Sequence, residues 1–261
     1  MGVSFGGALG FFAGSILRIR RREVVARLRA RAIAHPDEVA DAMYRTLGVG
    51  LGELLSLSRA GELGPQVVLT DRAEAALALM RNGAVVASAH TGSWDVLACN
   101  MAARLPLSLI TKRLSVKVLD DIWQNIRARR GITLLSGAGT MRSALEALAA
   151  RGVVATMIDQ APRRGLVFPF LGKEALHDET PAVLAHRSRR PFVVALGRRD
   201  TEGRHLLDVP LVLWPEGSAK AFVPEATRLA SDALGELVRA HPEQWLWLHR
   251  RWKGFERAAP P

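Results

Sequence analysis

Short apolar segments alternate with longer amphipathic ones between residues 71 and 158, and this alternation is the strongest constraint on the fold. The apolar runs are predicted to be strands at 84–89, 107–111, 132–135 and 153–158. The other segments have helical spacing and are predicted to be helices at 71–82, 93–104, 115–130 and 140–151. Because strands separated by helices of about 10 to 15 residues form βαβ units, the sequence predicts an α/β fold with a mixed, mostly parallel central sheet flanked by helices.

The flanking sequence is predicted to add further helices and a hairpin. Residues 24–34 alternate basic with apolar side chains, which is typical of a basic amphipathic helix, and a second helix is expected to begin after Pro36 and run toward Arg59. After Pro162 the pattern loosens into a loop, and it is followed by a helix near 180–189, a β-hairpin at 192–199 and 205–213, and a long last helix. Apolar residues at i, i+3, i+4 and i+7 indicate that last helix, namely Ala226, Leu229, Ala230, Ala233, Leu234, Leu237 and Val238.

We expect three parts in the chain: an N-terminal membrane-associating and helical segment at 1–64, an α/β domain at 65–254 and a tail at 255–261. Residues 1–17 carry no charge and contain five glycines, and a cluster of arginines follows them. A spanning helix needs about 20 apolar residues. The segment is therefore expected to be a marginal span, an interfacial helix with its basic end at anionic cytoplasmic lipid, or a helix that docks on the protein itself.

The charge and the cysteine content limit the possible partners and sites. The formal net charge of +11 favours an anionic partner, which nucleic acid, anionic lipid or an acidic carrier protein would each provide. The single cysteine, Cys99, excludes an internal disulfide and a zinc site built from cysteines. Because Cys99 stands among apolar residues at helical spacing, we predict a buried small hydrophobe rather than a nucleophile.

A polar stretch, SAHTGSWD at 88–95, follows the first predicted strand and places His90 five positions before Asp95. On one continuous helix these two residues would lie on different faces, but a strand–loop–helix arrangement with Gly92 in the loop would allow them to meet. Ser93 would cap the helix, and Asp95 would orient the imidazole and leave its other nitrogen as a general base. The spacing alone leaves open a capped helix with a hydrogen-bonded, non-catalytic histidine.

Other polar residues stand where predicted elements end. Asp159 and Gln160 follow a predicted strand, and ligands of parallel sheets bind at the carboxyl ends of strands. Arg127 belongs to a basic cluster near the end of a predicted helix, which is also typical of a solvated helix end. Residues 241–254 interleave three tryptophans with arginines and a lysine, which indicates either amphipathic packing or a lid at a lipid interface.

Taken together, these segments resemble the bacterial lipid A late acyltransferases, the lauroyl/myristoyl transferase family within the lysophospholipid acyltransferase superfamily. The resemblance runs from about residue 70 to 253, and its parts stand in family order: HTGSWD at 90–95, NIRARRGI at 125–132, GVVATMIDQAPRRG at 152–165, VFPFLGKEA at 167–175 and PEQWLWLHRRWK at 242–253. The last motif is highly specific. The chain departs from the family at Asp95, where the family usually has Glu and the glycerophospholipid acyltransferases have Asp, so the resemblance defines the acceptor less well than the chemistry.

The resemblance implies a glycerolipid-acyltransferase-like fold and an activity. The chain would move a fatty acyl group from a thioester of acyl carrier protein or coenzyme A to a hydroxyl of lipid A precursor or a related glycolipid, with no metal or other cofactor. The implied location is the cytoplasmic face of the bacterial inner membrane, with a membrane lipid as the anionic acceptor and no nucleic acid partner. Carried over by position, His90 and Asp95 are the expected catalytic pair, and the expected substrate-binding residues are Arg127, Asp159, Gln160, Phe170 and Gly172.

In the implied reaction His90 takes the proton of the acceptor hydroxyl as its oxygen attacks the thioester carbonyl. Backbone amides near Gly92 and an arginine are expected to stabilise the oxyanion. Acyl transfer to a lysophospholipid or another bacterial lipid is an alternative with the same chemistry. A non-catalytic basic module that binds membranes or nucleic acid is an alternative of another class. The pair of His90 and Asp95 argues against that module, because a binding surface does not need it.

Overall fold

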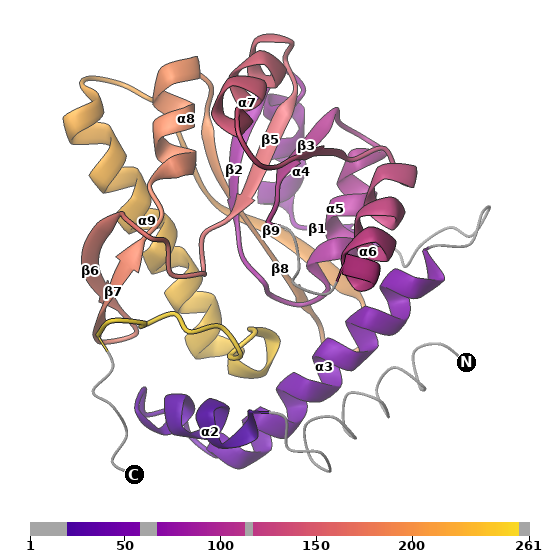
Figure 1. The fold of residues 1–261 in the computed structure, drawn as a ribbon, viewed down its shortest axis with the longest axis vertical. Coiled ribbons are helices and arrows are strands. Elements are labelled where there is room, and N and C mark those ends of the chain that lie inside the picture. Colours follow the sequence, from indigo (N-terminus) through magenta and orange to yellow (C-terminus); the bar gives the residue numbers. More distant parts are fainter. Residues whose placement is uncertain (1–19, 58–66, 113–116, 256–261) are drawn as a thin grey trace.

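The computed structural model describes residues 20–57, 67–112 and 117–255 (Figure 1). The uncharged segment at 1–17 lies outside the described residues, as does nearly all of the tail predicted at 255–261. Within the described ranges, no helix combines the length and the apolar character that crossing a bilayer requires.

The described residues contain a seven-stranded sheet with the strand order β1-β9-β8-β2-β5-β3-β4. The strands β2 (Ala84–Ser88), β3 (Leu107–Ile110), β4 (Thr133–Leu135), β5 (Val153–Met157) and β8 (Phe192–Arg199) pair in parallel. β8 and β9 (His205–Leu213) form the predicted antiparallel hairpin, and the edge strand β1 (Val67–Leu69) pairs in parallel with β9. The mixed, mostly parallel sheet is thus confirmed.

Helices cover both faces of this sheet (Figure 1). One face packs against α4 (Asp71–Met80), α5 (Trp94–Ala102) and α6 (Lys117–Arg129), and the opposite face packs against α7 (Thr140–Ala149), α8 (Thr180–Ser188) and α9 (Ala219–Ala240). Side chains of β2 alternate between the two cores, since Val85 and Ala87 belong to one and Ala84 and Val86 to the other. The predicted α/β class therefore holds, with apolar strands buried on both faces.

Two helices that precede the sheet in the sequence lie in the lower part of Figure 1. The basic helix predicted at 24–34 is α2 (Arg21–Arg29), and the helix predicted from Pro36 toward Arg59 is α3 (Pro36–Ser56). Both helices pack on the core, because Val24, Leu28 and Met43 are almost fully buried.

The segment after Pro162, predicted to be a loop, contains a separate two-stranded antiparallel sheet. Its strands are β6 (Leu166–Phe170) and β7 (Lys173–His177), and Leu171 and Gly172 form the turn with positive φ angles. The prediction missed these strands because each has only five residues and β6 contains Pro169, a residue that is uncommon inside strands. After α9 and a short 3₁₀ helix, η2 (Pro242–Gln244), residues 245–254 have no regular structure of their own except an isolated bridge between Thr91 and Trp245.

Candidate active site

The register between β2 and β5 brings His90 and Asp159 together. Ser88 at the end of β2 pairs with Met157 at the end of β5, so His90 and Asp159 each lie two positions beyond this pair. The carboxyl ends of parallel strands meet at one edge of a sheet, which is where polar side chains can face a ligand. Gly92 permits the tight return of the chain, because its φ is +55° and a Cβ there would lie 3.0 Å from Arg198 Cα.

Asp159 holds His90 by two hydrogen bonds. Its Oδ1 lies 2.9 Å from the ring Nδ1, and its Oδ2 accepts from the backbone amide of His90 at 3.0 Å and from Trp245 Nε1 at 2.9 Å. Burial alone would raise the pKa of Asp159, but the charge of His90 and the hydrogen bonds from His90 outweigh it, and the pKa is held well below its usual range. The ionised carboxylate fixes the proton on Nδ1, so Nε2 is left as the basic nitrogen.

Asp95 does not contact His90, and the expectation of that pair is wrong in this structure. Asp95 Oδ1 accepts from Arg127 Nε at 2.7 Å, and its Oδ2 accepts from Trp123 Nε1 at 2.9 Å. The reason is geometric, since the first turn of α5 carries the carboxylate toward α6, while Asp159 already occupies the ring nitrogen of His90. Asp95 therefore joins α5 to α6, and Arg127 is half of an ion pair with it.

A cavity of about 720 Å³ begins at His90 and extends beneath the sheet face that α4, α5 and α6 cover. Polar residues of its lining include His90, Arg127, Gln160 and His249, and the predicted Gln160 thus lies at the cavity. Its apolar lining includes Met80, Val86, Leu97, Met101, Leu105, Leu107, Leu109, Val153, Ala155 and Leu207. Since Val153 pairs with both Ala84 and Leu107, the lining reaches the amino ends of the strands, at the opposite end from His90.

Phe170 and Gly172 do not line this cavity, contrary to the expectation that they bind substrate. Phe170 is buried at the end of β6, where its ring packs against Trp245 and Trp252. Gly172 is in the turn between β6 and β7, and a Cβ there would meet nothing within 4 Å. The role of Phe170 is therefore to support the segment that carries Trp245.

The three tryptophans of the tryptophan-rich segment, residues 241–254, are buried rather than placed at a surface. Trp245, Trp247 and Trp252 are each at most 1% exposed, and Arg251 is equally buried. Main-chain hydrogen bonds tie this segment to the His90 loop, since Gly92 N donates to Gln244 O at 2.8 Å and Leu246 N donates to His90 O at 3.1 Å. The lipid-interface lid is thus wrong for these four residues. Packing is confirmed for the three indoles, whereas Arg251 is buried and does not snorkel.

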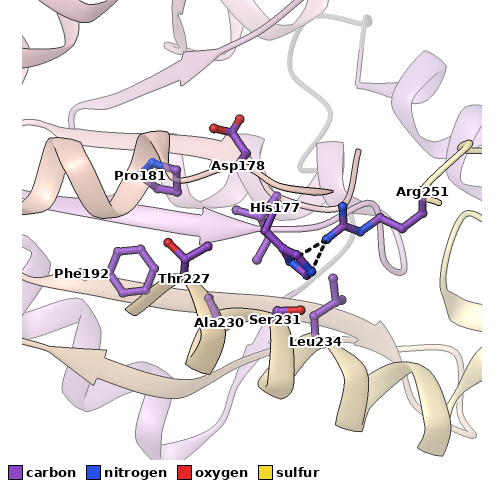
Figure 2. A pocket seen from close by; sticks show the side chains of 10 residues that line it. His177, Asp178, Pro181, Phe192, Thr227, Ala230, Ser231, Leu234 and Arg251 are labelled. Carbon is purple, nitrogen blue, oxygen red and sulfur yellow. Dashed lines mark hydrogen bonds between the residues drawn. The ribbon is translucent and has the colours of Figure 1, made fainter. Parts of the chain in front are cut away.

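Arg251 lies in a second, small pocket shown in Figure 2, whose volume of about 10 Å³ is room for about one water. Its guanidinium donates to Leu176 O and to His177 Nδ1, and burial lowers the pKa of Arg251 to about 10. Burial and the neighbouring Arg251 lower the pKa of His177 to about 3, so this imidazole is neutral. The pair joins β7 to the tryptophan-rich segment.

A buried network behind the His90 loop was not predicted. Glu53 of α3 accepts hydrogen bonds from Ser93 Oγ at 2.9 Å, from His205 Nε2 at 3.2 Å and from Arg199 Nη2. Burial would raise the pKa of Glu53, but the hydrogen bonds and charges of His205 and Arg199 lower it to about 2. Ser93 thus ties α3 to the loop instead of capping α5 with its side chain.

His249 is a further residue that the sequence did not indicate as part of the site. Its ring centroid lies 4.6 Å from that of His90, and one ligand atom from each of His90, Asp159 and His249 lies within 4.8 Å of the others. Two imidazoles and a carboxylate are a donor set that zinc accepts. Asp159, however, is already engaged by three hydrogen bonds, so the arrangement is that of a hydrogen-bonded pair with a neighbouring imidazole.

Cys99 is buried, as predicted, and burial raises the pKa of its thiol to about 12. A thiol in this state is not a nucleophile at neutral pH.

The family model described as bacterial lipid A biosynthesis acyltransferase matches residues 6–254. Among solved structures, the chain is similar to the 1-acyl-sn-glycerophosphate acyltransferase PlsC from Thermotoga maritima, with 11% identity, a TM-score of 0.41, and coverage of 88% of this chain and 94% of that one. The curated proteins give no match.

Proposed function

The chain belongs to the bacterial lipid A biosynthesis acyltransferase family and is an acyltransferase, and we propose that it moves a fatty acyl chain from a thioester to a hydroxyl of lipid A precursor or a related glycolipid. The donor is an acyl carrier protein or coenzyme A thioester. The observation that carries this proposal is the hydrogen-bonded pair of His90 and Asp159 at the opening of a large apolar cavity.

The reaction begins at the acceptor hydroxyl. His90 Nε2 takes its proton while the oxygen attacks the thioester carbonyl, a C–O bond forms, and the carbonyl electron pair moves to the oxygen. Asp159 stabilises the resulting imidazolium through Nδ1. When the intermediate collapses, the C–S bond breaks, the electron pair leaves with sulfur, and the proton on His90 Nε2 neutralises the thiolate. The step needs neither a metal ion nor an acyl-enzyme.

The cavity suits the acyl chain of the donor, because most of its lining is apolar and its depth runs along the strands. Lys112 and Arg127 stand in the lining where the strand β3 and the helix α6 end. These cations suit a phosphate of the donor arm or of the acceptor lipid. Arg127 can serve this role while it keeps its bond to Asp95, since a guanidinium has five donors.

A membrane surface is the proposed source of the acceptor, at the cytoplasmic face of the inner membrane. Val118 and Ile122 on α6 are 69% and 46% exposed, and the adjacent Lys117 is exposed as well. The same helix contributes Trp123, Gln124 and Arg127 to the cavity lining. Exposed apolar side chains beside a cation favour an anionic lipid surface, and the net charge of +11 acts in the same direction.

The test is acyl transfer by the full chain, with His90→Ala as the catalytic variant and His35→Ala as the matched control. His35 is exposed and does not line the cavity. We expect acyl transfer to be lost in His90→Ala and kept in His35→Ala, with both variants folded by circular dichroism. Mass spectrometry of lipids from cells with and without the protein identifies acceptor and chain. An acyl gain on a lysophospholipid would replace the glycolipid acceptor, and the absence of any acyl transfer would refute the proposal.

A further inference from the structure

Three of the backbone amides near Gly92, the region that the sequence suggested for the oxyanion, are engaged within the protein. The backbone amides of His90, Thr91 and Gly92 donate to Asp159, Ala89 O and Gln244 O. Arg127 keeps its 2.7 Å hydrogen bond to Asp95, and its remaining donors are assigned above to a phosphate. A negative charge that develops next to His90 therefore requires another hydrogen-bond donor near this ring.

His249 is positioned to provide it. Its ring is edge-on to His90, with an interplanar angle of 61° and a centroid distance of 4.6 Å, and it lines the same cavity. The hydrogen bond between Leu246 N and His90 O holds the segment that carries His249 against the catalytic loop. Both imidazoles can thus contact one reacting group.

Gln160 favours one tautomer of His249. The amide nitrogen Nε2 of Gln160 lies 3.5 Å from Nε2 of His249, and an amide nitrogen can only donate. With the amide in this orientation, Nε2 of His249 accepts and the proton is on Nδ1. In the described part of the chain, no hydrogen-bond partner takes this Nδ1 proton, so it is available to a substrate.

We propose that His249 is a catalytic residue of the acyl transfer, a neutral imidazole whose Nδ1–H donates to the oxyanion formed when the acceptor oxygen attacks the thioester. This role rests on the proposed function. His90 accepts the proton of the hydroxyl and is the general base. His249 donates a hydrogen bond to the oxyanion without giving up its own proton.

The surroundings keep His249 neutral. Burial lowers its pKa to about 4, Asp159 acts in the opposite direction, and His90, Arg20 and Arg27 lower it further. A neutral imidazole is the better choice for an oxyanion donor that must not protonate the intermediate, and it leaves the charge on His90 without a neighbouring cation.

The test compares His249→Ala, His249→Asn and the exposed control His35→Asn in the full chain. Loss of one oxyanion donor lowers kcat by about 10²- to 10³-fold. We expect this loss for His249→Ala, with the KM values for thioester and acceptor changed by less than threefold, and a recovery of at least tenfold in His249→Asn, whose carboxamide can donate. His35→Asn should equal the wild-type protein. A wild-type kcat in His249→Ala, a loss confined to KM, or equal rates for the Ala and Asn variants would overturn the assignment.

A second measurement does not depend on activity or on the fold of a variant. In the wild-type protein, the ring carbon resonance of His249 should show no titration midpoint between pH 8 and pH 5 in an NMR titration. A titration of His249 within that range would exclude a neutral donor. If the wild-type protein transfers no acyl group to any lipid hydroxyl, the proposed function fails, whereas normal transfer with a dispensable His249 overturns this inference alone.

Discussion

Asp159 accepts hydrogen bonds from both the ring Nδ1 and the backbone amide of His90, at 2.9 and 3.0 Å. The same carboxylate thus sets the orientation of the imidazole and the path of the loop that carries it. Trp245 Nε1 adds a third hydrogen bond and fixes the carboxylate itself. Three segments far apart in the sequence therefore determine the position and orientation of the His90 imidazole.

Substitutions of the two carboxylates near the site, Asp159 and Asp95, should have very different effects on kcat. Asp159→Asn replaces the acceptor of the Nδ1 proton, so we expect kcat to fall by about 10⁴-fold, as loss of the carboxylate in a His–Asp pair does. Asp95→Asn keeps that pair and disturbs only the contacts with Arg127 and Trp123. Its kcat should fall by less than about tenfold, with a lower midpoint of unfolding. Equal losses of kcat in the two variants would contradict this division.

The length of the transferred chain should depend on Ala155. This residue lies midway along β5, paired with Val86 and Leu109, and it lines the cavity between His90 and the far end near Val153. Ala155→Leu adds side-chain volume at this point, so we expect the preferred thioester to become shorter and the longest accepted chain to lose at least about tenfold in kcat/KM.

The control for this prediction carries the same chemical change outside the cavity. Ala149 is exposed near the end of α7, and Ala149→Leu should keep the wild-type order of chain lengths. Competition assays with mixed thioesters measure both variants. An unchanged order in Ala155→Leu would show that the acyl chain lies elsewhere.

The free energy of unfolding in acid should depend on the ionisation of Glu53. Its pKa is about 2 in the folded chain and 4.5 ordinarily, so its contribution is complete above about pH 4.5 and disappears as the pH falls toward 2. The shift corresponds to about 3 kcal/mol at neutral pH. Glu53→Gln should therefore be less stable by this order at pH 7, and the difference should shrink between pH 5 and pH 2. Urea unfolding of both proteins across this pH range measures the difference. A difference that does not change with pH would refute the role of the ionised Glu53.

Binding to anionic vesicles should depend on the exposed apolar side chains of α6. The double substitution of Val118 and Ile122 by Ser removes two side chains that would enter the lipid interface, so we expect affinity to fall at least about tenfold. Val167 is 52% exposed on β6, and Val167→Ser is the control that should keep wild-type binding. Sedimentation with vesicles that contain phosphatidylglycerol gives the affinities. If all three proteins bind equally, α6 does not face the membrane.

Much of the fold could be predicted because its signals are local. The helix predicted at 71–82 and the strand predicted at 84–89 lie within a few residues of α4 and β2, and Thr70 caps α4 by accepting from Ala73 N. β1 could not be found in the same way, since it has only three residues and depends on its pairing with β9, more than 130 positions later.

The site was only partly predictable, for a related reason. His90, Asp159 and Gln160 were identified at strand ends, but which acid meets His90 depends on the register between β2 and β5, and which residue meets Asp95 depends on how α5 packs on α6. His249 belongs to a segment without periodicity. The high specificity of the motif at 242–253 was the one available signal for it.

The hydrogen bonds that join residues 90–92 to residues 244–246 also have a consequence for biosynthesis. A nascent chain on the ribosome contains His90 and Asp159 long before Trp245 and His249 leave the exit tunnel. Until then residues 90–92 lack their main-chain partners and Asp159 lacks the hydrogen bond from the Trp245 indole. The arrangement around His90 is therefore completed only after residues 244–246 have been synthesised, although His90 and Asp159 lie far earlier in the chain.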